Sequence, residues 1–97
     1  MSTAVSEPRI VSIKVDDDSI SATLTDGRRI SVPLAWFPRL LHGTPDERSK
    51  WRFVAGGEGI HWPDLDEDVS VEGLLAGRPS GESQSSFKRW LEKRTTT

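Results

Sequence analysis

The sequence predicts a small α+β domain, in which a three-stranded antiparallel meander and a short return strand carry two or three short helices on one face. Three observations support this prediction. Apolar and polar residues alternate along residues 9–33, which is the period of a strand with one buried face. Apolar residues after position 35 recur at helical spacing, next to helix-capping residues. The length of 97 residues fits one domain.

Residues 9–33 predict the antiparallel meander. The first strand is expected to bury every second side chain, namely Val11, Ile13 and Val15. Asp26-Gly27 separates the second run from the third, and this dipeptide favours a tight hairpin turn with positive φ at both positions. Pro33 ends the third run, because proline cannot donate to a strand ladder.

Two short helices and a strand are predicted next. Residues 36–41 carry tryptophan, phenylalanine and leucine side chains at helical spacing. A second helix is expected over residues 45–51, because Thr44 can cap it and Glu47 can complete a capping box. A return strand is expected near residues 52–62.

A last short helix and the chain ends complete the organisation. Ser70 suits the N-cap of this helix and Gly77 its C-terminal stop. Residues 1–8 are small and polar, and we expect them to be disordered. Residues 9–77 then form the single domain, and residues 78–97 form a flexible tail able to fold as a short amphipathic helix.

Composition excludes several classes of protein. The chain has no cysteine, so disulfides, thiolate nucleophiles and cysteine-based zinc sites are excluded. No apolar run approaches the ~20 residues of a membrane span. The first eight residues lack the basic and apolar segments of a signal peptide. We therefore expect a cytoplasmic protein without membrane contact.

The charge is unevenly divided along the chain, although the net charge is only −2. Residues 56–72 carry six acidic side chains and no Lys or Arg, whereas residues 73–97 carry five basic and two acidic ones. An acidic block suits a partner with a basic surface. The basic tail leaves a nucleic-acid partner open, although such partners usually contact a broad basic face.

Three strings of the chain resemble a family of small bacterial proteins of unknown function. They are DGRRISVPL at residues 26–34, WFPRL at residues 36–40 and GEGIHWPDLDEDVSVEGLL at residues 57–75. The likeness covers roughly residues 9–77. It implies a small α+β fold and a prokaryotic source.

The resemblance also implies a genetic setting. Members of this family often stand beside a second small protein, in an arrangement that resembles a toxin–antitoxin gene pair. Some relatives carry a helix-turn-helix domain after this one, where this chain has only its short tail. The family has no established catalytic residues, so none is transferred to this chain.

The acidic segment allows two interpretations. Asp64, Asp66 and Asp68 have the alternate spacing that opens a calcium loop, but Val69 stands where glycine is needed and Leu75 where glutamate is needed. The plain interpretation is a solvated loop that caps the next helix. The functional interpretation is an acidic loop that accepts Lys or Arg from a partner.

Acid–base chemistry is the competing hypothesis. Glu58, His61 and Asp64 could support it if they converge. On a strand, however, Glu58 and His61 would point to opposite faces, because their separation is odd. No hydrolase motif and no metal-binding histidine spacing occurs in the sequence. We therefore expect no catalytic residue, no metal and no cofactor, and keep a hydrolase using Glu58 and His61 as an alternative.

The leading hypothesis is a non-catalytic protein-binding module, the antitoxin-like member of a two-gene pair, with a small basic protein as its partner. Trp62 is expected to be partly exposed beside the acidic loop. The expected binding residues are Glu58, His61, Trp62, Asp64, Asp66, Glu67, Asp68 and Trp90. The other alternative is a small regulatory nucleic-acid-binding protein that acts through its basic tail. The oligomeric state stays open.

Overall fold

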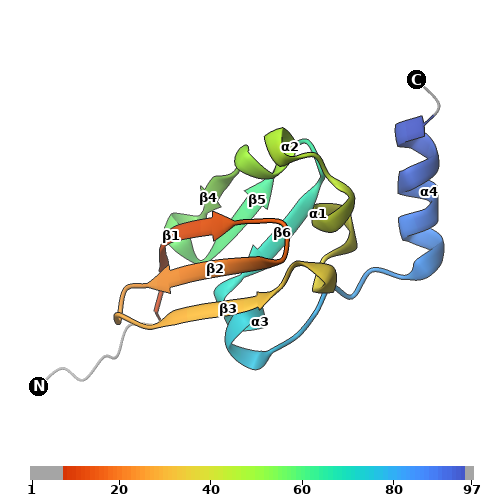
Figure 1. The fold of residues 1–97 in the computed structure, drawn as a ribbon. Helices are drawn as coiled ribbons and strands as arrows, with labels where there is room; N and C mark the ends of the chain where they lie inside the picture. Colours follow the sequence, from red (N-terminus) through yellow and green to blue (C-terminus); the bar gives the residue numbers. More distant parts are fainter. Residues whose placement is uncertain (1–7, 96–97) are drawn as a thin grey trace, which may run out of the picture.

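Two antiparallel sheets form the body of the protein. The computed structural model describes residues 8–95, so the expected disorder of residues 1–8 falls, except at Pro8, outside the described residues. Within them the sheets have the strand orders β1-β2-β3 and β4-β5-β6 (Figure 1). The strands are β1 (Ile10–Val15), β2 (Ser19–Leu24), β3 (Arg29–Pro33), β4 (Arg52–Val54), β5 (Gly59–Trp62) and β6 (Glu67–Ser70).

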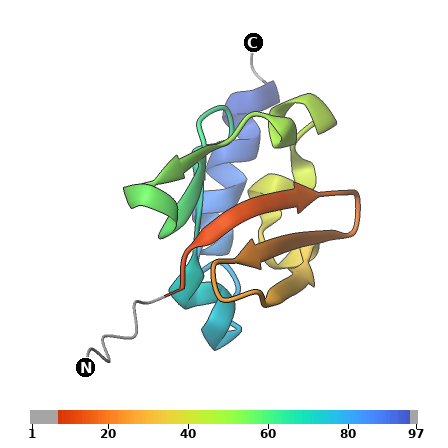
Figure 2. The ribbon, with the colours of Figure 1, turned by 90° about the vertical axis from the view of Figure 1, so that its left-hand side faces the viewer.

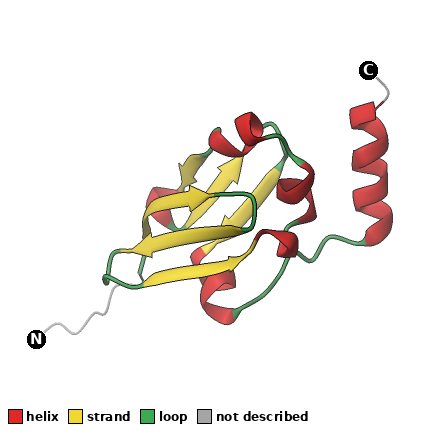
Figure 3. Cartoon of the chain, in the orientation of Figure 1, coloured by secondary structure: helices red, strands yellow, loops and turns green. Residues whose placement is uncertain are grey.

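Short helices fill the connections, which confirms the α+β class (Figure 3). The 3-10 helices are η1 (Leu34–Trp36) and η2 (Ala55–Gly57), and the α-helices are α1 (Pro38–His42), α2 (Pro45–Ser49), α3 (Val71–Ala76) and α4 (Gln84–Thr95). In Figure 1, α1 and α2 lie together at one end of the two sheets, and α3 lies below β3. Figure 2 shows α4 on the far side of the molecule from β1.

The meander of β1, β2 and β3 is confirmed, but the inward face of β1 differs from the prediction. The register shifts between Ile10 and Ser12, so a β-bulge stands at Val11. Val11 is therefore 53 % exposed, and Ile10, at 3 % exposed, takes the buried place. A bulge adds one residue to a strand and reverses which alternate side chains face inward before it. Ile13 and Val15 are half-buried, as their alternation predicts.

The turn between β2 and β3 is longer than the predicted two-residue turn. The N–H of Leu24 donates to the carbonyl of Arg28 at 2.8 Å, so three residues form the loop. Gly27 has φ +91, whereas Asp26 is not in the left-handed region. The loop is thus a turn followed by a glycine bulge, the usual three-residue hairpin, and the expectation of positive φ at Asp26 was wrong.

The second sheet has more strands than the single return strand that the sequence predicts near residues 52–62. Ala55, Gly56 and Gly57 all have positive φ, so the chain reverses within η2 and divides the segment into β4 and β5. The acidic segment adds β6, which pairs antiparallel with β5. Its chain reversal lies before residue 67, and Asp66 has φ +49 there. Glu67 and Asp68, expected in a loop, therefore belong to a strand.

Local capping signals are confirmed. The N–H of Glu47 donates to Thr44 Oγ1 at 3.0 Å and the N–H of Thr44 donates to Glu47 Oε1 at 2.9 Å, which is a complete capping box. The N–H of Gly73 donates to Ser70 Oγ at 2.9 Å at the start of α3. Gly77 ends α3 with φ +68. These short-range signals depend on neighbouring residues alone, which is why the sequence shows them.

The core lies between the two sheets and the helices beside them. Among the described residues, fourteen buried apolar side chains form it: Ile10, Ile20, Ala22, Leu24, Val32, Leu34, Phe37, Leu40, Ile60, Trp62, Leu65, Val69, Val71 and Leu74. A buried arginine supports the helical end. Arg48 is 8 % exposed and its Nη1 donates to the carbonyls of Leu40 and Gly43, each at 3.3 Å. It thereby binds the C-terminal end of α1, where the N–H of the C-cap residue Gly43 also donates to the carbonyl of Leu40.

The tail folds back beside α1 and α2. Arg94 in α4 donates two hydrogen bonds to Glu47 in α2, at 3.0 and 2.8 Å. The ring of Phe87 lies 5.1 Å from that of His42. The guanidinium groups of Arg39 and Arg94 lie 5.3 and 4.7 Å from the ring centroid of Trp90. The amphipathic helix considered for the tail is thus formed, and long polar and aromatic side chains hold it.

Candidate functional site

Exposed carboxylates gather along β6 and the turn before it. The side chains of Asp66 and Asp68 are 84 % and 71 % exposed, and that of Asp64 is 45 % exposed. Asp68 is in register with His61 on β5, and His61 Nδ1 lies 2.8 Å from Asp68 Oδ1. The pairing places this histidine and this aspartate on the outer face of the second sheet.

Two cations from other parts of the chain, Lys50 and Arg39, lie among these carboxylates, and each of them pairs with two acidic side chains. Lys50 lies 3.1 Å from Asp46 and 3.9 Å from Asp64. Arg39 lies 3.6 Å from Asp66 and pairs with Glu82 as well. The sequence indicated an acidic stretch without neighbouring cations, and this interpretation is therefore corrected. The surface retains a surplus of carboxylates because each of these cations serves two of them.

Glu67 points away from this exposed face, toward the interior. Glu67 is half-buried, and this burial raises the pKa of its carboxyl group. Two groups lower this pKa: the N–H of Asp68, which donates to Glu67 Oε1 at 3.0 Å, and the positive charge of Arg39. The negative charges of Glu82 and of the Asp68 side chain raise it further. Burial prevails, since removal of a carboxylate from water disfavours its charged form.

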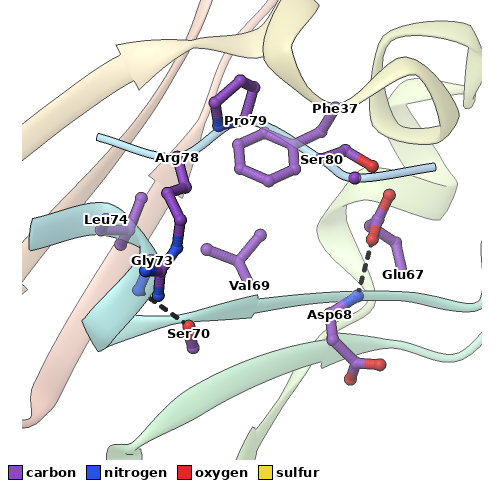
Figure 4. A pocket seen from close by; sticks show the side chains of 11 residues that line it. Phe37, Glu67, Asp68, Val69, Ser70, Gly73, Leu74, Arg78, Pro79 and Ser80 are labelled. Carbon is purple, nitrogen blue, oxygen red and sulfur yellow. Dashed lines mark hydrogen bonds between the residues drawn. The ribbon is translucent and has the colours of Figure 1, made fainter. Parts of the chain in front are cut away.

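A cavity of about 210 Å³ lies next to Glu67, between β6 and residues 78–81. Figure 4 shows Phe37 and Pro79 on the side opposite β6, with Val69 beneath them and Glu67 at one end. Arg78 lies at the other end, and its Nη2 donates to Glu72 at 3.0 Å. The site thus combines an apolar middle with charged groups at both ends.

The backbone of β6 contributes to this cavity. The N–H of Val71 donates to the carbonyl of Glu58 at 2.9 Å, which makes these two residues a hydrogen-bonded pair. Hydrogen-bonded and non-hydrogen-bonded pairs alternate along antiparallel strands. Asp68 and Ser70 therefore direct their backbone groups away from β5, and both residues line the cavity.

Trp62 does not belong to this surface. The structure buries it completely, at 0 % exposed, and its Nε1–H donates to the carbonyl of Arg48 at 2.9 Å. The expectation of a partly exposed Trp62 was wrong. It follows Ile60 by two residues on β5, and this inward face of the strand packs into the core. The indole N–H is hydrogen-bonded there, so complete burial of the side chain leaves no polar group without a partner.

In the described part of the chain, no hydrogen bond or ion pair joins the proposed acid–base residues Glu58, His61 and Asp64 to one another. Glu58 follows η2 and lines a cavity with Gly59 and Asp68, whereas His61 bonds to Asp68 across the outer face of the sheet. Within residues 8–95, no group of three or more histidines and carboxylates is arranged to hold a metal ion. No helix of that part of the chain is long and apolar enough to span a membrane.

Trp90 lies in α4, where Arg39 and Arg94 flank its ring, and Arg39 also lies 3.6 Å from Asp66. Sequence reasoning missed two ion pairs of this region, because the partners in each pair are distant in the chain. Arg39 Nε donates to both carboxylate oxygens of Glu82, at 2.9 and 3.0 Å, across 43 positions. Arg94 and Glu47 are 47 positions apart. No local pattern in the sequence signals such pairs.

Comparison with known proteins finds a family and two solved structures that resemble this chain. Residues 10–80 match the family described as "Protein of unknown function (DUF2442)". A crystal structure of a protein of unknown function from Rhodospirillum rubrum has a TM-score of 0.68 and 26 % identity, and the match covers 82 % of this chain and 96 % of that one.

A second structure supports the fold alone. A solution structure of an uncharacterised protein from Chromobacterium violaceum has a TM-score of 0.63 and 22 % identity, with 90 % of this chain and 76 % of that one covered. No curated protein matches the sequence. The family match spans β1 to the segment that lines the cavity and ends before α4. The chain therefore belongs to the DUF2442 family of proteins of unknown function.

Proposed function

We propose that this protein is a non-catalytic protein-binding module whose acidic surface, formed by Asp64, Asp66 and Asp68, binds a small partner protein with a basic surface. The observation that carries the proposal is the surplus of exposed carboxylates along β6, where Lys50 and Arg39 are each shared between two acids. Complementary charge accelerates encounter and selects the partner, even where each exposed pair adds little affinity.

The support comes from how the carboxylates are held. Asp68 is fixed on a strand and hydrogen-bonded to His61, so its orientation is set before a partner arrives. Asp66 stands in a left-handed turn at the strand's start, with its carboxylate 84 % exposed. Preorganised groups lose less side-chain entropy on binding than flexible ones.

We extend the proposal to an antitoxin-like role in a two-gene pair. The family resemblance motivates this extension, and the acidic surface supplies the chemistry that a basic partner needs. It predicts that the protein encoded by the adjacent gene co-purifies with this chain in fixed stoichiometry when both are expressed together. Cytoplasmic location is part of the same proposal.

The test compares two matched variants of the full chain. Asp66→Asn with Asp68→Asn removes two charges from the proposed surface and keeps groups able to bond His61 and to adopt the turn. Asp18→Asn with Asp26→Asn removes two charges from the hairpin turns of the first sheet. We expect the first pair to weaken the complex about tenfold in low salt and the second to leave it unchanged, by isothermal titration calorimetry. Equal affinities of both variants would refute the proposed surface.

A further inference from the structure

We propose that the cavity between β6 and residues 78–81 receives one Lys or Arg side chain of the partner, with the carboxyl group of Glu67 as its acceptor. This inference rests on the proposed function and deepens it, because it names the chemical group that the acidic surface recognises and where that group enters.

The walls of the cavity suit the stem of such a side chain. Phe37, Leu74 and Pro79 supply apolar surface, and the volume is about 210 Å³. Lys and Arg bury their methylene stems along apolar surface while the charged head seeks a polar partner. A phosphate or another anion would meet the carboxyl group of Glu67 at one end, and at the other end the Arg78 guanidinium is already paired with Glu72.

The acceptor is in place and has no cation of its own. Within residues 8–95, Glu67 makes no ion pair, because the neighbouring guanidinium of Arg39 is already committed to Glu82 and Asp66. Arg78, at the opposite end of the cavity, bonds to Glu72. A half-buried carboxyl group without a direct cationic partner therefore stands at the end of a cavity whose lining is mostly polar and includes an apolar stretch.

Charges of both signs face Glu67. They are Arg39 from α1, Glu82 from the segment before α4 and Asp68 from β6. Of these three charges Arg39 acts most strongly and lowers the pKa of Glu67, whereas Glu82 and Asp68 raise it, and the salt bridge to Glu82 engages the Arg39 guanidinium. Burial raises the pKa of Glu67, and a bound ammonium or guanidinium group would lower it again.

The test is a heteronuclear NMR titration of the full-length, 15N-labelled protein with N-acetyl-arginine amide. N-acetyl-norleucine amide, which keeps an apolar stem without the charge, is the control ligand. We expect saturable shifts at the amides of Asp68, Ser70 and Gly81, which line the cavity. Glu67→Gln should weaken this binding about tenfold, because a charge-assisted hydrogen bond is lost.

A second variant tests whether weaker binding is specific to the cavity or follows from the loss of any negative charge. Asp18→Asn removes one carboxylate charge from an exposed residue in the turn between β1 and β2 that does not line the cavity, and we expect less than a twofold change. Equal weakening by both variants, equal shifts with the norleucine compound, or the absence of saturable shifts would each overturn the inference. Retained amide dispersion in Glu67→Gln shows that the variant is folded.

The two proposals fail separately. If the arginine compound does not bind at the cavity while Asp66→Asn with Asp68→Asn still weakens the partner complex, only the cavity inference is lost. If the compound binds but the partner complex is insensitive to those aspartates, the acidic-surface proposal is lost. The same amides could also shift when the protein concentration alone is raised. A second copy of this chain would then be the source of the cation, and the inference of a different partner protein would be overturned.

Discussion

The contact between α4 and α2 gives a quantitative prediction. Glu47 completes the capping box of α2 through Thr44 and also accepts two hydrogen bonds from Arg94 in α4. The Arg94 guanidinium, as the largest cause, lowers the pKa of Glu47 from 4.5 to about 2. This lowering of the pKa of Glu47 corresponds to at most about 3 kcal/mol. Solvent screening and the contribution of Thr44 reduce the share of Arg94 to about 1–2 kcal/mol.

The perturbation is Glu47→Gln, which keeps an oxygen for the capping box and removes the charge that Arg94 requires. Arg94→Gln is the matched variant, because it breaks the same pair without touching α2. We expect each to lower the free energy of unfolding by about 1–2 kcal/mol, and the double variant to show about 1 kcal/mol of coupling. Urea unfolding followed by tryptophan fluorescence measures both quantities.

The pH dependence has a definite sign. Because the folded-state pKa of Glu47 is lowered, its stabilisation is present above about pH 4.5 and is lost as the pH falls toward 2. In Glu47→Gln that loss should shrink between pH 5 and 2. Additive single variants, or an acid sensitivity that Glu47→Gln does not reduce, would show that α4 is not held by this pair.

Two further variants test the fold. Trp62→Ala should lower the free energy of unfolding by about 3–5 kcal/mol by urea denaturation, because it empties a buried site and leaves the carbonyl of Arg48 without its donor. It therefore tests the core and not the partner surface, and a change below about 1 kcal/mol would contradict the burial. Gly57→Ala should cost about 1–3 kcal/mol, because φ is +104 and the added Cβ would lie 2.9 Å from the carbonyl oxygen of Ile10. The control Gly81→Ala meets no atom within 4 Å, so thermal unfolding should separate the two glycine variants clearly.

Much of the fold was predictable because its signals are local. The alternation along β2, the capping box at Thr44 and Glu47, and the stop at Gly77 all depend on residues within a few positions. The acidic composition of residues 56–72 was equally visible. Such features follow from side-chain chemistry and backbone geometry before any long-range packing occurs.

The tertiary structure decided the features that depend on residues far apart in the chain. A bulge turned Val11 outward, and the pairing of β5 with β6 divided the acidic block into exposed aspartates and an inward Glu67. Packing between the sheets buried Trp62, although its neighbours His61 and Pro63 are polar or turn-forming residues. The sequence by itself determined which charges and caps are present. Strand register and packing determined which carboxylates face solvent and which one faces the cavity. They depend on contacts between many residues that are distant in the chain.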